Sequence, residues 1–453
     1  MGPKSPPPGS KELFRQELVE MIDIQRPLVK LAALIDWRVF EREWSGFFPS
    51  TLGRPALPPR LVAGLLYLQH TYGVSDEVLV ERWVENPYWQ HFCGETYFQH
   101  ELPCNPSALT RWRQRIGEEG VEWLLTQTIE AARTGKMVEK RSFDKVIVDT
   151  TVQEKAIAHP TDSRLLERVR IKLVKLAKDG GLKLRQNYNR EAPRVAVQIG
   201  RYAHAKQFKR MRGSLRRLKS IVGRIVRDIE RQIVAVPAEG LAELQHRLSQ
   251  ARRLLEQKKD SKNKLYSLHA PEVECISKGK SRTPYEFGVK VTIASTHKEG
   301  LVVGMRSMPG NSHDGHTLRE ALEQVEILTG HRPKEAFVDL GYRGHSAPDD
   351  IKVYHSRLKK GITPRLRRDI RRRSAIEPII GHMKNDGLLR RNWLKGALGD
   401  YLHAVLCGCG QNLRLILKKL RFFYALIALA WVARWRERQC KITGLCEMVV
   451  CAG

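Results

Sequence analysis

The sequence predicts a mixed α/β protein with an all-helical N-terminal region and a long helical insertion after its first strand. Three observations carry this prediction. Helical spacing dominates residues 12–135, short β-branched runs occur at residues 145–152 and 285–308, and basic helical patterns fill residues 163–260. At 453 residues the chain is too long for one ordinary core, so we expect two or more domains.

The N-terminal region begins with helix start and stop signals. Pro58 and Pro59 precede leucines at near-helical spacing, which predicts a helix with proline in its first turn. The turn signal at residues 72–76 ends this helix, and Ser75 or Asp76 can cap a second helix that runs through Trp83.

A third helix is expected from near Ser107, and it carries three arginines, Arg111, Arg113 and Arg115. A helix, a short glycine-containing turn, a helix and then a basic helix are compatible with a helix-turn-helix DNA reader. A plain helical bundle with a solvated basic face fits the same pattern equally well. The tryptophans Trp83, Trp89 and Trp112 are expected in the core of such a bundle.

The first strand is predicted at residues 145–149, a β-branched run that ends on Asp149. Residues 163–260 then change to long basic helices, broken at Gly180-Gly181 and near Pro237. Between Arg164 and Lys219 there are 18 lysines and arginines against three acidic residues. Such an imbalance needs a counter-charge, which a phosphate backbone supplies.

Strand patterns return at residues 285–308, where two alternating runs flank a glycine-containing turn and predict a hairpin. A helix is expected next, capped by Asp314 or Thr317 and running through Leu328. Asp314 and His316 are alternatively candidates for supporting a nearby site.

A further short strand, residues 335–339, ends on Asp339. We expect a weaker strand at residues 361–364 and a helix at residues 369–386, which carries Glu377. No internal repeat is apparent.

The charge balance identifies the class of partner. The chain has 79 lysines and arginines against 49 acidic residues, a net charge of +30 and a pI near 10.0. This excess argues against an enzyme of neutral metabolites and favours nucleic acid, because each neutralised phosphate releases counterions. A ribosomal or membrane-surface protein could show the same bias.

The eight cysteines are irregularly spaced and form no Cys-x-x-Cys pair: Cys93, Cys104, Cys275, Cys407, Cys409, Cys440, Cys446 and Cys451. We therefore expect reduced thiols rather than disulfides or a zinc site. The N-terminus shows no secretory signal, and the apolar run 422–433 is too short to span a bilayer. The prediction is a cytoplasmic, nucleoid-associated protein without membrane partners.

Asp149, Asp339 and Glu377 form the candidate catalytic site. The carboxyl ends of strands are where an α/β sheet exposes side chains to ligands. Three hard oxygen ligands suit Mg²⁺ or Mn²⁺, and two such ions can drive an in-line phosphoryl transfer. No phosphate-binding loop or nucleophile elbow competes with this interpretation.

Glu377 has a cation before and after it on the same predicted helix. Arg373 precedes it by four residues and Lys384 follows it by seven, so all three share one face. A metal ligand between two phosphate contacts explains this arrangement, and a surface salt bridge between Arg373 and Glu377 explains it as well.

The spacing Arg373-x₃-Glu377-x₆-Lys384 resembles a motif of bacterial DDE insertion-sequence transposases, the group around families four and five. Family five is the more similar in its N-terminal region. In the family a tyrosine stands three residues before the arginine, where this chain has Ile370. The other similar stretches, in order, are residues 148–152, 285–290, 310–317, 338–344 and 392–396. The resemblance covers residues 15–420.

The resemblance implies an RNase H-like catalytic core at residues 136–162 and 281–400, split by a basic helical insertion at residues 163–280. A flexible tail at 1–11, a helical DNA-binding domain at 12–135 and C-terminal helices and tail at 401–453 complete this division. It further implies Mg²⁺- or Mn²⁺-dependent cutting of element ends and strand transfer into target DNA.

On this interpretation, Asp149, Asp339 and Glu377 hold two metal ions, and Arg373 and Lys384 contact phosphates of the terminal inverted repeat. A homodimer is suggested. Two alternatives stay open: an impaired or domesticated transposase that only binds DNA, and a metal-dependent nuclease.

Overall fold

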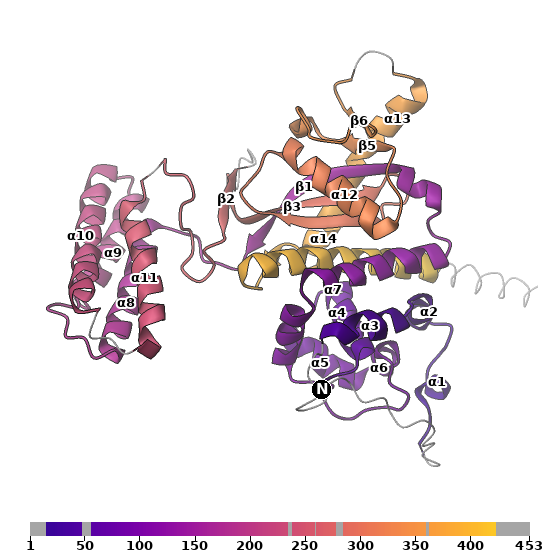
Figure 1. The fold of residues 1–453 in the computed structure, drawn as a ribbon, viewed down its shortest axis with the longest axis horizontal. Coiled ribbons are helices and arrows are strands. Elements are labelled where there is room, and N and C mark those ends of the chain that lie inside the picture. Colours follow the sequence, from indigo (N-terminus) through magenta and orange to yellow (C-terminus); the bar gives the residue numbers. More distant parts are fainter. Residues whose placement is uncertain are drawn as a thin grey trace, which may run out of the picture.

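The computed structural model describes residues 15–47, 56–233, 238–258, 260–277, 284–358 and 362–422. The tail expected at 1–11, most of the apolar run 422–433 and the C-terminal end lie outside these residues. Figure 1 shows a mixed sheet above a layer of N-terminal helices, with a separate helical bundle to one side. The predicted α/β class is therefore confirmed.

The N-terminal region is helical, as expected. It comprises α1 (Leu18–Met21), α2 (Pro27–Leu34), α3 (Arg38–Glu43), α4 (Pro59–Tyr72), α5 (Asp76–Glu85), α6 (Pro87–Cys93) and α7 (Pro106–Thr134). The expected start and stop signals act locally. Gly73 ends α4 with a left-handed φ of 65°, and the Ser75 hydroxyl accepts a hydrogen bond from the Val78 amide at the start of α5.

The sheet has seven strands. They are β1 (Lys145–Lys155), β2 (Glu274–Ser277), β3 (Tyr285–Thr296), β4 (Val302–Met308), β5 (Glu335–Val338), β6 (Lys352–His355) and β7 (Arg391–Asn392). The order is β2-β3-β1-β5-β6, with β4 on β3 and β7 on β1. β3 and β4 form the expected antiparallel hairpin, whereas β1, β5 and β6 are parallel.

Both faces of the sheet are covered, and alternate residues of β1 point to different layers. Val146 and Val148 join a core that includes α12 (Leu318–Thr329) and the N-terminal helices. Ile147 joins the opposite core, together with residues of α14 (Ile376–Asn385) and of a long helix at residues 396–422.

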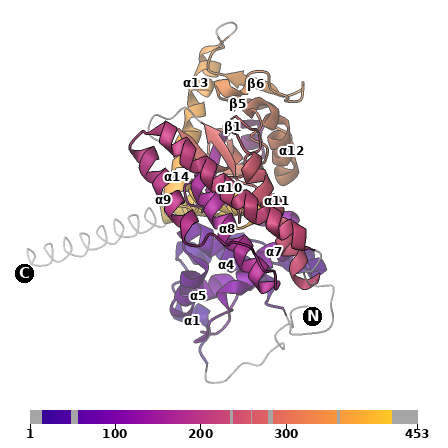
Figure 2. The same cartoon turned by 90° about the vertical axis from the view of Figure 1, so that its left-hand side faces the viewer.

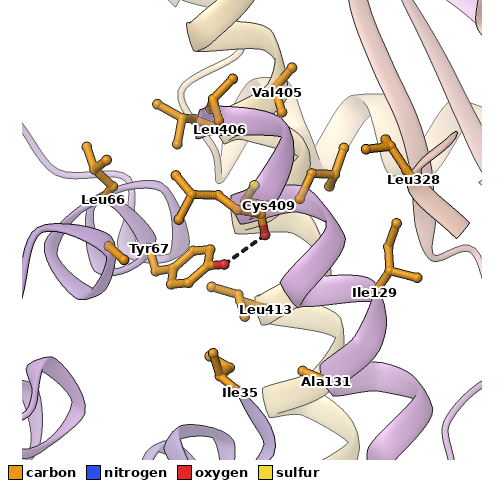
Figure 3. Packing of buried hydrophobic residues seen from close by; sticks show 14 of the residues in the cluster. Ile35, Leu66, Tyr67, Ile129, Ala131, Leu328, Val405, Leu406, Cys409 and Leu413 are labelled. Atoms are coloured by element: carbon orange, nitrogen blue, oxygen red, sulfur yellow. Dashed lines mark hydrogen bonds between the residues drawn. The ribbon is translucent and has the colours of Figure 1, made fainter. Parts of the chain in front are cut away.

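The N-terminal helices share their core with this sheet through the long helix at residues 396–422. Figure 3 shows Tyr67 of α4 beside Cys409 and Leu413 of that helix, and Ile129 of α7 lies in the same core on the side of Leu328. The buried Tyr67 hydroxyl donates a 2.7 Å hydrogen bond to the Leu124 carbonyl of α7, so its polar end is satisfied. Among the described residues, no helix combines the length and apolar character needed to cross a bilayer.

The insertion between β1 and β2 is a bundle of four helices, α8 (Asp162–Asp179), α9 (Glu191–His204), α10 (Phe208–Gln232) and α11 (Ala238–Glu256). Its apolar residues form a hydrophobic core of their own, which draws only on residues 165–268. Figures 1 and 2 show the bundle projecting from the edge of the sheet. The predicted break at Gly180-Gly181 separates α8 from α9.

Three local predictions are wrong. β1 continues past Asp149 to Lys155, so this aspartate lies within the strand and not at its end. The described part of residues 361–364 contains no strand, and the edge strand β6 lies earlier, at Lys352–His355. The helix expected at residues 369–386 is interrupted, because α13 (Pro364–Arg372) ends in a 3₁₀ turn before α14 begins. Pro378 explains the interruption, since proline clashes with the carbonyl four residues earlier and is tolerated only in the first turn of a helix.

Candidate active site

The register of β1 and β5 places Asp149 beside Asp339. Ile147 lies opposite Phe337 in this parallel pair, and both side chains enter the core beneath α14. Two residues farther along the chain are Asp149, within β1, and Asp339, which follows β5 with its backbone still extended, so both point to the same face of the sheet. Parallel neighbours are about 4.8 Å apart, so two acidic side chains share one edge of this face.

Arg373 joins these aspartates to Glu377. Its Nη1 lies 3.5 Å from Oδ2 of Asp149 and 3.7 Å from Oδ1 of Asp339, and its Nη2 donates to Oε1 of Glu377 at 3.0 Å. The interrupted helix produces this geometry, because Arg373 occupies the 3₁₀ turn and Glu377 the first turn of α14. All three predicted catalytic residues thus contact one guanidinium.

The cluster is open to solvent and carries excess negative charge. The side chains of Asp149, Asp339 and Glu377 are 19%, 51% and 63% exposed, and one arginine faces three carboxylates. Nη1 of Arg373 is buried and has no hydrogen-bond partner. A cation already lies between these acids, and their hard oxygen donors are the type that Mg²⁺ and Mn²⁺ prefer.

Behind Asp149, on the other face of β1, a second polar group supports the site. The Thr150 hydroxyl donates to Oδ1 of Asp314 at 3.0 Å, and Nζ of the buried Lys290 lies 3.0 Å from the same oxygen. Asp314 therefore does not cap α12, contrary to one expectation. Thr317, the other expected cap, forms no side-chain capping bond to that helix.

Tyr342 is the last residue of the 3₁₀ turn that follows Asp339, and its side chain is buried. Burial is the main cause that raises the pKa of its hydroxyl, and the carboxylates of Asp149 and Asp314 add to the shift. Tyr342 thus stays protonated at neutral pH. Ile370, at the position where the family has a tyrosine, packs against the apolar core beneath α14.

The cations expected to contact DNA fall into different environments. Arg111 and Arg115 are exposed on α7, and Lys384 is half-buried on α14. Arg113 is 4% exposed and lies 2.6 Å from Asp76, so the structure contradicts its expected role as a DNA contact. Trp83, Trp89 and Trp112 are buried in the core, as expected.

Two features of the site were not predicted from the sequence: the contribution of Lys290 and the position of Arg373 among the acids. Lys290 gave no clear signal, because it occupies one of the polar positions that alternate with the apolar residues of β3, and only the structure shows that it is buried. Arg373 was expected to face phosphates, and its spacing alone does not show which carboxylates it contacts.

Comparison with known proteins assigns two segments. Residues 16–115 match a transposase domain (DUF772), and residues 223–398 match a transposase DDE domain. The second match contains Asp339 and Glu377 but begins in α10, after Asp149. No solved structure matches the chain.

The chain is also similar to the uncharacterized protein ORF8 in the nfe locus of Rhizobium meliloti. The two are 50% identical over 208 residues, which is 46% of this chain and all of the relative. The protein belongs to the bacterial DDE insertion-sequence transposases. Its class is therefore that of DNA-binding enzymes that mobilise DNA, and this family generally uses divalent metal ions.

Proposed function

We propose that this transposase cuts the ends of an insertion sequence and joins them to target DNA at a site formed by Asp149, Asp339 and Glu377. The observation that carries the proposal is the contact of one guanidinium, that of Arg373, with all three carboxylates. These acids are far apart in the sequence, and the fold brings them together on one face of the sheet.

The three acids would hold Mg²⁺ or Mn²⁺, two ions in the complete site. Bound ions would activate a water or a 3′-hydroxyl and stabilise the leaving oxygen. Arg373 keeps the carboxylates near one another and offsets part of their repulsion in the absence of DNA. A phosphate of the element end gives this guanidinium a second anion to bind.

The surrounding regions supply the grip on DNA. We assign the helices of residues 12–135 and the basic insertion of residues 163–280 to binding of the terminal inverted repeats. Exposed arginines support this assignment, among them Arg111, Arg115, Arg212, Arg216 and Arg224. Residues 136–162 and 281–400 form the catalytic core together with β2, which follows the helices of the insertion and pairs with β3, and this mixed sheet supports an RNase H-like fold. The helix of residues 396–422 packs against the sheet and the N-terminal helices, and a homodimer is part of the proposal.

Cleavage of a DNA duplex that ends in the inverted repeats of the element, with Mg²⁺, tests this function. Wild type should nick at the repeat boundary, and Glu377→Gln should bind the same DNA without cutting it. Asp386→Asn is the matched control, because this exposed acid lies just after the same helix and pairs only with His382 among the described residues.

Full cleavage by Glu377→Gln would refute the site. Binding without cleavage by the wild type would instead identify a DNA-binding protein that has lost its activity. Cutting of any branched DNA, independent of the repeats, would identify a nuclease.

A further inference from the structure

Outside the proposed active site, His70, His403 and Cys407 form a buried cluster. Their donor atoms all lie within 4.8 Å of one another. His403 and Cys407 are four residues apart on the helix of residues 396–422 and therefore share one face, while His70 comes from the last turn of α4.

The hydrogen bonds of the two imidazoles leave one nitrogen of each available. Nδ1 of His70 lies 3.1 Å from the Leu66 carbonyl, and Nε2 of His403 lies 2.9 Å from the Leu388 carbonyl. A carbonyl only accepts, so these nitrogens carry the protons and the opposite nitrogens, Nε2 of His70 and Nδ1 of His403, keep their lone pairs. Metal-binding histidines in proteins are commonly oriented by this type of second hydrogen bond.

We propose that His70, His403 and Cys407 bind a zinc-like transition-metal ion through two imidazole nitrogens and a thiolate. Three atoms no farther apart than 4.8 Å can all lie within about 2.8 Å of one point, close to the zinc bond lengths of about 2.0–2.3 Å. Nitrogen and sulfur donors select zinc over Mg²⁺. The Cys407 thiol loses its proton to solvent when the metal–sulfur bond forms.

A fourth ligand has room to enter. His70 and His403 both line a cavity of about 470 Å³, whose other walls include Trp393 and Arg113. A water molecule from this cavity would complete a tetrahedral site. Burial is the main cause that raises the pKa of the Cys407 thiol to about 12, and the positive charge of Arg414, which donates to the His70 carbonyl at 2.7 Å, opposes the shift.

The position of the cluster suggests that a bound ion would link two parts of the fold. Here the end of α4 meets both the long helix and the turn that follows α14. The contact is close, because a Cβ at Gly410 would lie 2.2 Å from the His70 carbonyl oxygen. A bound metal would therefore fasten α4 of the N-terminal region to the helix of residues 396–422. The expectation of simple reduced thiols overlooked this possibility, since the two parts of the cluster are 333 positions apart.

Elemental analysis of the full chain, purified without a polyhistidine tag, tests the proposal. Wild type should retain about one zinc per chain. The zinc content of Cys407→Ser and of His403→Gln should each be at least about tenfold lower. Cys409→Ser is the matched control, since this buried cysteine lies on the same helix outside the cluster. Cobalt added to the metal-free wild type should give a thiolate charge-transfer band that Cys409→Ser retains.

A folded wild type that retains no zinc and gives no cobalt band would overturn the proposal. Metal that is lost in Glu377→Gln and kept in Cys407→Ser would also overturn it, because the ion would then occupy the proposed active site. If Cys407→Ser does not fold, the comparison of His403→Gln with the wild type decides. None of these outcomes depends on cleavage of DNA.

Discussion

β1 carries two clusters of charged side chains with opposite properties. At its end, Nζ of Lys155 lies 2.9 Å from Glu272 and 2.7 Å from Asp400, and Asn392 donates to the same Asp400 oxygen. Lys155 and Asp400 are 5% and 6% exposed. In the middle of the strand, the acids around Arg373 reach solvent, and Nη1 of that arginine has no hydrogen-bond partner.

The difference separates a structural charge cluster from a binding site. Around Lys155, hydrogen bonds satisfy the buried charges, and the cluster joins the last residue of β1 to the segment that returns from the insertion. Around Asp149, three acids exceed one cation and remain accessible to a ligand. Removal of one partner from a buried and satisfied charge cluster destabilises the fold, whereas accessible charges in excess are available for chemistry.

Replacement of Asp149 by asparagine should give the largest effect. A metal ion contributes several kcal/mol to the transition state, and about 4 kcal/mol corresponds to roughly a thousandfold in rate. We expect Asp149→Asn to slow strand cleavage at least about a thousandfold, with the urea midpoint of unfolding nearly unchanged. A large loss of stability with normal cleavage would reverse the roles assigned to the two clusters.

Lys155→Met should mainly reduce stability. It leaves Asp400 and Glu272 without their cation, and loss of one partner from a buried pair costs about 3–5 kcal/mol. We expect the free energy of unfolding, measured with urea, to fall by about 3 kcal/mol. This value is at the lower end of that range because Glu272 is partly accessible to water. Arg373→Met is the comparison, and its cost should stay below about 1 kcal/mol because its acids reach water. Equal losses of stability in Lys155→Met and Arg373→Met would contradict the difference between the two charge clusters.

The pH dependence of stability should reveal Asp400. Burial is the main cause that raises the pKa of this carboxyl, and Lys155 opposes the shift. The folded state therefore binds this proton more tightly than the unfolded state. The stability gained from protonated Asp400 is complete below the ordinary carboxyl pKa of 3.8. It is lost as the pH rises through the raised pKa of the folded state. Relative to Asp400→Asn, wild type should lose unfolding free energy across that window, by less than about 1.4 kcal/mol per pH unit. A difference independent of pH would contradict the shift.

The smallest effect should come from single DNA contacts. Removal of one phosphate contact lowers the slope of log K against log salt by about 0.9. Arg111→Ala should show this change in binding titrations at several salt concentrations. Arg113→Ala should keep the slope and lower stability instead, since Arg113 pairs with Asp76 inside the helical layer. A reduced slope for Arg113→Ala would restore its original assignment.

Much of the fold could be predicted because its signals are local. Prolines, an N-capping serine and alternating β-branched residues mark α4, α5, β1 and the β3–β4 hairpin. β6 was misplaced because four partly polar residues form a strand only by pairing with β5. The break at residues 373–375 had a local signal in Pro378. The prediction of one continuous helix at residues 369–386 did not take this proline into account.

The acidic residues of the candidate site could be predicted from the sequence, but the side chains that contact them could not. The two short apolar runs indicated which aspartates to choose, and the parallel register places Asp149 beside Asp339, although β1 continues past Asp149 to Lys155. The pairing of Lys290 with Asp314 joins residues from different elements on the far side of β1, and no spacing rule connects them. The cluster of His70 with Cys407 is hidden for the same reason.

The insertion also has a consequence for the order of folding. Residues 146–154 of β1 pair with residues 288–296 of β3, so two neighbouring strands must find each other across the whole bundle. Each doubling of an open loop costs about 0.6 kcal/mol in closure entropy and delays such contacts. Because the bundle has its own core, it can form first and bring its two ends together. A large insertion then acts kinetically as a short connection, and destabilising its core should slow formation of the sheet.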